Sequence, residues 1–425
     1  MTIPFSPVSP VLAADDDNGD ISTVTTSTTI TIPDPTPPVN TPTPTKPDPL
    51  STDHITATWN SIDGLKTNDE NKSENKFVSF DPSAYKAMKD DESRTPLFER
   101  AIQQRLQNSP DNIPASEQVV LDIGTGPFAL FAITAAQAGA GKVYAIEANR
   151  EAAKSARATV QQLGLTNTIT ILEGFSTEIT LPTKADFVIA EIVGSIATEE
   201  GAYATILDAH ERHVKKPEEG SSWIPSRIQT FAAPAGYTLH NMFSPPAFDW
   251  GKLKGEPVRF NCRDEALQIL SDPVVVEDIE FKDVKRGVPR RLGGSTLTSQ
   301  QISFVIDGER MNDNRVKFRD ELRRGGLRKL ELEQMTTKTG QTVSGIAMWP
   351  RILLDTEEQI LINTRTYPKG DHQKSHWQTV LPIMSDEPVR VKDGDEVLVT
   401  VDFNVPDSVL SAPTYKLDGD ILHYS

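Results

Sequence analysis

The 425-residue sequence predicts an α/β fold in which a doubly wound, mostly parallel sheet precedes an antiparallel β-barrel-like domain. Three observations predict this fold. Short apolar runs alternate with helix-forming stretches between residues 117 and 190, as in a parallel sheet covered on both faces. After residue 226, short strand patterns are bounded by turn signals, which is typical of antiparallel barrels. The length also suits two domains, because single cores stop growing near about 250–300 residues.

Residues 1–75 are predicted to form a disordered, Thr/Pro-rich tail. Eleven of the 31 prolines fall within the first 50 residues. Such a sequence has too little apolar surface to offset the entropy of ordering the chain. Eleven acids against three lysines in this tail account for nearly half of the formal charge of −17. Although residues 11–14 resemble a cleavage site, we do not expect secretion, because a basic n-region is missing and early prolines interrupt the apolar stretch.

The first domain, residues 76–226, is predicted to contain four buried strands and the helices between them. The strands are short, apolar and β-branched, at residues 119–123, 142–147, 169–172 and 187–190. Helix formers predict helices at 128–138 and 149–162, with Asn149 as the N-cap of the second. Ligands bind such sheets at the carboxyl ends of the strands.

A nucleotide site is predicted at that edge of the sheet. Gly124 and Gly126 follow the first strand, where the absence of side chains lets a ligand approach the backbone. Glu147 ends the next strand 21 residues after Gly126, where an acid can hold both ribose hydroxyls. The turn also fits a dinucleotide fingerprint, with Ala129 in the third position. Asp122 favours S-adenosylmethionine (SAM), because an acid before the turn can reach that ligand's amino group.

Two glutamates stand nine residues apart after the fourth strand. Glu191 and Glu200 flank Gly194, so the segment can close into a loop on which the carboxylates face each other. Paired carboxylates suit acid–base chemistry with separated pKa values, or a bidentate grip on a planar guanidinium. An equal alternative is a solvated acidic helix start, because Glu199 and Glu200 also favour a helix N-terminus.

Together these motifs resemble the protein arginine N-methyltransferases, a family of class I SAM-dependent enzymes, over residues 85 to about 404. The signature loop of that family carries two glutamates at the separation of Glu191 and Glu200, and its ribose-binding acid matches Glu147. Further family motifs match Met88 and Arg94 in an N-terminal helix, Ser176 and Thr177 in the adenine-contacting segment, and Ser375-His376-Trp377 in a Thr-His-Trp loop. The family's third turn glycine is replaced here by Phe128. The short sequence segments around Ser176 and Glu200 resemble most the branch of the family that includes monomethylating members.

The resemblance implies an enzyme that transfers a methyl group from SAM to a guanidinium nitrogen of arginine in protein substrates. It implies catalytic roles for three residues, Glu191 and Glu200 as a clamp and His376 as a contact of that loop that helps to carry away the proton. The implied SAM-binding residues are Met88, Arg94, Asp122, Gly124, Gly126, Glu147, Ser176 and Thr177. A homodimer with a helical arm near residues 242–270 is also implied. Two alternatives remain open. One is a SAM-dependent methyltransferase with a non-arginine substrate, and the other is a catalytically silent scaffold.

The second domain, residues 227–425, is predicted to be the substrate domain. Its predicted strands lie at residues 230–234, 274–281, 301–306, 352–354, 359–364 and 396–403. Turn signals include Asp307-Gly308 and Asp393-Gly394. Basic clusters at 285–291 and 315–329 are predicted to be solvated loops rather than nucleic-acid contacts, because no aromatic residues are interleaved for base stacking.

Composition excludes several classes of protein. The single cysteine, Cys262, rules out an internal disulfide framework and a Cys-rich zinc site, and no metal is expected. The apolar run at 129–140 is far shorter than the roughly 20 residues of a membrane span, so no membrane partner is expected. An acidic chain argues against nonspecific nucleic-acid binding. We expect a cytoplasmic or nuclear protein.

Overall fold

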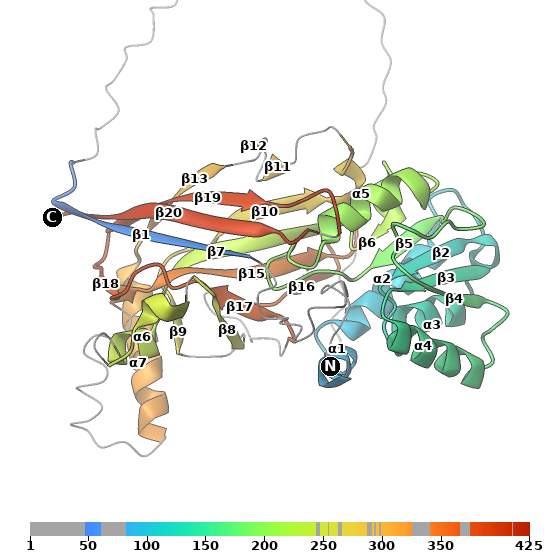
Figure 1. The fold of residues 1–425 in the computed structure, drawn as a ribbon, viewed down its shortest axis with the longest axis horizontal. Helices are drawn as coiled ribbons and strands as arrows, with labels where there is room; N and C mark the ends of the chain where they lie inside the picture. The colour runs from blue at the N-terminus through green and yellow to red at the C-terminus, as the bar shows by residue number, and fades with distance from the viewer. Residues whose placement is uncertain are drawn as a thin grey trace, which may run out of the picture. The chain divides into compact units, whose positions relative to one another are not determined.

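The computed structural model describes residues 47–60, 82–243, 247–253, 255–261, 266–286, 291–292, 295–296, 299–324, 341–365, 375–409 and 411–425 (Figure 1). Residues Asp48–Ser425 form one unit. Within the described ranges, no helix is both long enough and apolar enough to cross a membrane.

A five-stranded parallel sheet has the order β4-β3-β2-β5-β6. Its strands are β2 (Val119–Ile123), β3 (Lys142–Glu147), β4 (Ile169–Glu173), β5 (Phe187–Ala190) and β6 (Trp223–Ile224). The helices of this region are α1 (Pro82–Lys89), α2 (Thr95–Gln107), α3 (Leu130–Gln137), α4 (Arg150–Gln162) and α5 (Ala202–Arg212). The four predicted strands and two predicted helices are thus confirmed. Asn149 caps α4 by accepting from the Ala152 N–H at 3.0 Å, as expected.

Two larger antiparallel sheets form the second part of the unit. One has the order β10-β7-β15-β17-β8, with β16 on β15 and β9 on β7, and the other has the order β1-β20-β19-β13. The strands of the first are β7 (Arg227–Tyr237), β8 (Val258–Asn261), β9 (Leu267–Ile269), β10 (Val274–Glu280), β15 (Gly345–Leu353), β16 (Leu361–Asn363) and β17 (Gln378–Leu381). Those of the second are β1 (Ser51–Asn60), β13 (Gln300–Val305), β19 (Glu396–Asn404) and β20 (Thr414–His423). All six strands predicted here are present; β7, β15 and β19 are longer than expected, and β10 and β16 are shorter.

Smaller elements complete the described structure. Two short antiparallel pairs join β11 (Arg291–Leu292) to β12 (Ser295–Thr296) and β14 (Thr342–Val343) to β18 (Val389–Arg390). The remaining helices are α6 (Thr238–Met242) and α7 (Gly308–Arg324), with 3-10 turns at Ala115–Glu117, Gly220–Ser222, Trp250–Leu253 and Phe281–Asp283.

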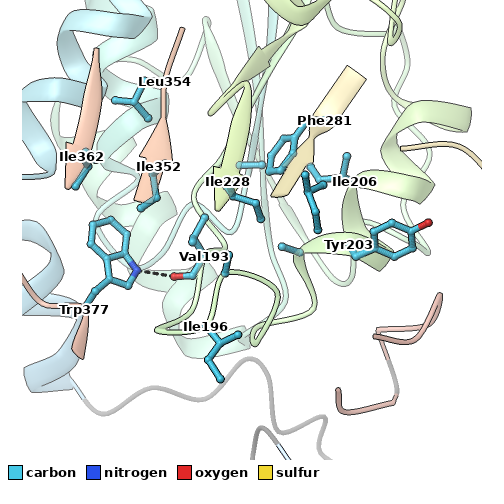
Figure 2. Close-up of a cluster of buried hydrophobic side chains, with 14 of the residues drawn as sticks. Val193, Ile196, Tyr203, Ile206, Ile228, Phe281, Ile352, Leu354, Ile362 and Trp377 are labelled. Carbon is cyan, nitrogen blue, oxygen red and sulfur yellow. Dashed lines mark hydrogen bonds between the residues drawn. The ribbon is translucent and has the colours of Figure 1, made fainter. Parts of the chain in front are cut away.

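A continuous hydrophobic core joins the parallel sheet to the antiparallel sheets. Figure 2 shows one part of it, in which Val193 lies between Trp377 and Ile228 of β7, and Ile196 lies farther along the same loop. Val193 and Ile196 belong to the loop that follows β5, and both are at most 2% exposed. This loop is therefore part of the core rather than a mobile surface connection.

Strand β1 corrects the prediction that the chain is disordered up to residue 75. It pairs with β20 along its whole length, from Ser51 opposite His423 to Asn60 opposite Thr414. In its second half Ile55, Ala57 and Trp59 are buried in alternation with exposed residues, and Trp59 stacks on Tyr415 with ring centroids 5.4 Å apart. The high Ser/Thr content concealed this period-two pattern. The remaining predicted tail, residues 1–46 and 61–75, lies outside the described residues.

Helix α7 corrects the prediction of a hairpin turn at Asp307-Gly308. The Asp307 carboxylate accepts from the N–H groups of Glu309 and Arg310 at 2.9 and 3.2 Å, which are N-cap bonds. Residues 315–324 are consequently helical, whereas the basic cluster was predicted to be a loop, and 325–329 lie outside the described residues. Part of the other basic cluster, 287–290, is also outside them.

The segment 242–270 differs from the helical arm that was predicted. Strand β8 pairs with β17 and strand β9 pairs with β7, so the helical interpretation is wrong for these residues. Phe260 and Leu267 are each 3% exposed because they pack on the second hydrophobic cluster of the sheet. A role of this segment in dimerisation stays a prediction.

Candidate functional site

The glycine turn after β2 has the backbone shape that only glycine adopts readily. Gly124 and Gly126 have φ values of +75° and +67°. The N–H groups of Gly124 and Thr125 donate to the Ile146 carbonyl of β3 at 3.0 and 3.1 Å. A Cβ at Gly126 would lie 3.8 Å from the ring of Tyr85 on α1, so this helix passes next to the turn.

Glu147, the predicted ribose acid, is physically joined to this turn. One carboxylate oxygen accepts from the Gly126 N–H and the other from the Asn149 N–H, each at 2.8 Å. Burial raises the pKa of Glu147, and these backbone donors partly oppose that rise. Each oxygen keeps a second lone pair for a hydroxyl donor. The arrangement therefore fits the predicted role.

Asp122 lies beneath the turn rather than beside a ligand. Its carboxylate is 1% exposed and accepts from the Thr125 hydroxyl at 2.6 Å and from the Ala132 N–H at 3.1 Å. Burial raises the pKa of Asp122 to about 7. The predicted contact with a ligand's amino group does not suit this position, because the carboxylate braces the turn against α3.

Ser176 and Thr177 follow β4 at the same edge. The neighbouring Gly174 N–H donates to the Glu147 carbonyl at 2.9 Å, which places the segment beside the end of β3. The Ser176 carbonyl accepts from His213 Nε2 at 2.9 Å, so its backbone is fixed from α5. Four predicted features, the turn, Glu147 and these two residues, thus lie together.

Arg94, predicted to bind the SAM carboxylate, pairs here with a predicted clamp residue. Its Nη2 donates to the Glu191 carboxylate, and its Nη1 donates to the Met88 carbonyl at 3.0 Å. The guanidinium carbon lies 4.9 Å from the centroid of the Phe131 ring, and the residue is 6% exposed. Met88, Arg94 and Glu191 are therefore brought together, and Met88 contributes through its backbone.

The loop from Glu191 to Glu200 is docked on the antiparallel sheet. Its carbonyl at Val193 accepts from Trp377 Nε1 at 2.6 Å, a bond drawn in Figure 2. Further polar contacts join the Gln378 N–H to the Ser195 hydroxyl at 3.1 Å, the Ala197 N–H to the Thr230 hydroxyl at 2.9 Å, and the Thr198 hydroxyl to the Glu277 carboxylate. The second part of the chain thus fixes the shape of the loop.

The alternative that Glu199 and Glu200 form the solvated first turn of a helix is wrong. Glu199 is 5% exposed and pairs with Arg259 of β8, whose Nη1 lies 3.3 Å from the Glu199 carboxylate. Helix α5 begins later, at Ala202, with Gly201 as its N-cap. Burial raises the pKa of Glu200 to about 8, and the nearby Glu191 and Glu199 carboxylates add to the rise.

His376 was predicted to contact the glutamate loop. In the structure it hydrogen-bonds to Asp91 instead. Its Nδ1 and its backbone N–H both lie 2.8 Å from the same Asp91 oxygen. Trp377 and Gln378 make the contacts with the loop instead. Although burial raises the pKa of Asp91, hydrogen bonds from His376 and Ser93 hold that pKa below its ordinary value.

Sequence reasoning missed Asp91 and Arg259. Asp91 stands between the Met and the Arg of the N-terminal motif, and its spacing from His376 is 285 residues. Arg259 lies 60 residues after Glu199. No local pattern signals either pairing, since both depend on how the two parts of the chain pack.

Comparisons with known proteins agree with this geometry. A family model described as PRMT5 arginine-N-methyltransferase matches residues 75–221. Protein arginine N-methyltransferase PRMT10 of Arabidopsis thaliana is 34% identical over 168 residues, covering 39% of this chain and 42% of that protein. Histone-arginine methyltransferase CARMER of Culex quinquefasciatus is 35% identical over 176 residues, covering 41% of this chain and 27% of that protein. Over the matched residues, this chain is therefore similar to the protein arginine N-methyltransferases.

Other arginine methyltransferases match a longer part of the chain at lower identity. Protein arginine N-methyltransferase 2 of Xenopus tropicalis is 26% identical over 330 residues, covering 74% of this chain and 65% of that protein. The crystal structure of Arabidopsis thaliana protein arginine methyltransferase 10 in an open conformation covers 79% of this chain and 97% of that one, with a TM-score of 0.53 and 19% identity. The Trypanosoma brucei PRMT1 enzyme–prozyme heterotetramer with AdoHcy gives the same coverage and TM-score at 17% identity. These structures share the fold, while the matches to PRMT10 and CARMER span less than half of those proteins. The monomethylating branch stays a hypothesis.

Phe128 is where this chain departs from the glycine turn of the arginine methyltransferases that it resembles. Its ring lies 4.8 Å from the Lys89 ammonium at the end of α1, and the side chain is half-buried. The larger residue thus packs toward the N-terminal helix. Gly126 and Glu147 keep their bond beside it.

Proposed function

We propose that this protein transfers a methyl group from SAM to a guanidinium nitrogen of arginine in protein substrates. The observation that carries the proposal is the docked loop, which carries the partly buried Glu191 and Glu200, with Glu191 paired to Arg94, after the carboxyl end of β5. Relatives named for arginine methylation support it. In this proposal residues 76–226 hold SAM, and residues 227–425 shape the loop and carry substrate-binding surface.

The residues at the glycine turn fit SAM. Gly124 and Gly126 expose backbone at positive φ, and Glu147 presents acceptors for ribose hydroxyls. Arg94 offers a buried guanidinium to a carboxylate, and its Nε has no hydrogen-bond partner among the described residues. Ser176 and Thr177 would lie beside the adenine. SAM would supply a methyl group activated by its sulfonium.

Glu191 and Glu200 would hold the substrate guanidinium. That group is a poor nucleophile, because it stays protonated throughout the physiological pH range and its lone pairs are delocalised. Two carboxylates on one side localise the positive charge there and leave a terminal nitrogen richer in electrons. They also fix its direction, so the contribution is one of positioning and electrostatics.

His376 and Asp91 suit the removal of the proton that methylation releases. When Nδ1–H donates to Asp91, Nε2 is left as the accepting nitrogen. The backbone N–H of His376 donates to the same carboxylate, which fixes the residue's position. The pair thus presents a base with a defined tautomer near the loop that Trp377 anchors.

An Arg/Gly-rich peptide, SAM and mass spectrometry test the proposal. We expect wild-type protein to raise the mass of the peptide by one CH2 unit per transfer, because each methyl group replaces a hydrogen on an arginine nitrogen. Glu191→Gln and Glu200→Gln should each lower the rate by about 100-fold or more, since each removes charge that acts on the reacting group, while SAM binding by calorimetry survives. Glu357→Gln, in an exposed loop, is the matched control.

Other outcomes decide between the alternatives. Wild-type protein that binds no SAM would support the silent scaffold. SAM-dependent methylation of a non-arginine acceptor, with none on arginine, would support a methyltransferase of another substrate class.

A further inference from the structure

Three carboxylates crowd the glutamate loop, although the proposed chemistry uses two. Glu199 stands directly before Glu200 and is 5% exposed. Its side chain runs back across Gly194, where an added Cβ would meet the Glu199 Cβ at 2.6 Å. The Ile196 N–H lies 3.4 Å from its carboxylate. Glu199 is therefore folded into the loop and cannot turn to solvent without opening it.

Arg259 supplies the countercharge from the other part of the chain. Both terminal nitrogens of its guanidinium bond to the two Glu199 oxygens, which is the fork-to-fork geometry that arginine makes with carboxylates. Arg259 lies on β8, opposite Val380 of β17. Strand β17 begins directly after Trp377, whose indole holds the same loop. One sheet edge thus provides both the anchor and the charge.

Resting on the function proposed above, we propose that Arg259 is a positioning residue for the arginine clamp. By pairing with Glu199, it keeps that carboxylate folded in the loop and leaves Glu191 and Glu200 to act on the substrate guanidinium. A buried carboxylate without such a partner would either take up a proton or repel its neighbours.

Electrostatics around Glu200 agree with this role. The charged groups that act on Glu200 are Glu191 and Glu199 of its own loop, Arg94 at the start of α2 and Arg259 of β8. Tyr415 of β20 acts on the Glu199–Arg259 pair, and Glu277 of β10 acts on Tyr415. Burial and the two glutamates raise the pKa of Glu200, and the two arginines lower it. Removing the Arg259 charge should raise this pKa further, and removing the Glu199 charge should lower it.

The test is the pH profile of kcat/KM for an Arg/Gly-rich peptide. The acidic limb of this profile is the rise in kcat/KM with pH as Glu200 loses its proton. For Arg259→Gln we expect the midpoint of this limb to move to higher pH by about one unit or more, which is the effect that a neighbouring opposite charge has on the pKa of a carboxyl. Activity at pH 7 should fall about tenfold and recover in part near pH 9. Glu199→Gln should move the limb in the opposite direction.

The double variant and the conservative variant separate charge from simple structural damage. Glu199→Gln combined with Arg259→Gln should return the limb toward its wild-type position, and Arg259→Lys should keep most of the activity. Arg259→Gln with an unmoved limb, or a double variant no better than Arg259→Gln, overturns the proposal. If wild-type protein methylates no arginine, both the function proposed above and this role of Arg259 fail. If wild-type protein is active but Arg259→Gln leaves the acidic limb in place, only the role of Arg259 fails.

Discussion

Single residues of this site show what local sequence can and cannot reveal. Gly124, Gly126, Glu147 and the two clamp glutamates could be placed from spacing, because the carboxyl ends of parallel strands meet at one edge. The contacts of Asp122 with Thr125 and Ala132 could not be predicted, since a pattern does not say which way a carboxylate turns, and its contact with a ligand stays a prediction. The partners of His376 and Glu199 depend on packing between distant segments.

Asp91 gives a prediction at this scale. Asp91→Asn should lower kcat for peptide methylation by about 10- to 100-fold. The Asp91 carboxylate accepts from Nδ1–H of His376 and so leaves Nε2 as the base, whereas an amide can also donate and no longer fixes that tautomer. SAM affinity measured by calorimetry should stay within about twofold. Asp90→Asn, the exposed neighbour, is the control. Equal activity of the two variants would contradict the role of the pair.

Asp122 gives a second prediction, on stability. Its folded pKa of about 7 lies above the ordinary 3.8, so the folded state binds this proton more tightly than the unfolded state does. The contribution of this group to unfolding free energy must therefore fall as pH rises from about 4 to 7, by about 2–4 kcal/mol. Asp122→Asn keeps a carbonyl acceptor for Thr125 but cannot ionise.

Urea unfolding of wild type and Asp122→Asn at pH 5 and pH 8 checks this expectation. The variant should lose less stability than the wild type between the two values. A parallel loss in both proteins would show that Asp122 stays ionised or that its burial is compensated.

Among the secondary-structure elements, strongly patterned strands were the most predictable. All four predicted parallel strands and the Asn149 cap were confirmed, because buried β-branched runs and N-caps are local signals. Strand β1, strands β8 and β9, and helix α7 were missed. Biased composition concealed the alternation in β1, while the others are short or charged and obtain their order from neighbouring strands.

Strand β1 provides the prediction at this scale. Trp59→Ala should destabilise the protein by about 3–5 kcal/mol, because the side chain is 5% exposed and stacks on Tyr415. Thr58→Ala, whose side chain is exposed on the opposite face, should change the urea midpoint little. Equal midpoints for the two variants would show that β1 contributes little to the folded unit.

The whole molecule carries an apolar patch that bears on the predicted homodimer. Leu239, Met242, Phe243 and Phe248 are 38–45% exposed and lie within ten residues of sequence around the end of α6. Contiguous exposed apolar groups of this kind mark protein interfaces. We expect the wild type to sediment as a dimer and Leu239→Asp/Phe243→Asp to sediment as a monomer at the same concentration. Val305→Asp, on β13, is the control and should stay dimeric; a monomeric wild type would refute the dimer.

The docking of the glutamate loop has a consequence for how the proposed activities can be divided. From Val193 to Glu199, alternate residues hydrogen-bond to Trp377, to Gln378 of β17, to Thr230 of β7 and to Arg259 of β8. A fragment ending at residue 226 would therefore keep the glycine turn and both clamp glutamates but lose the contacts that hold the loop in shape. On the function proposed above, we expect such a fragment to keep binding of the methyl donor and to lose recognition of arginine.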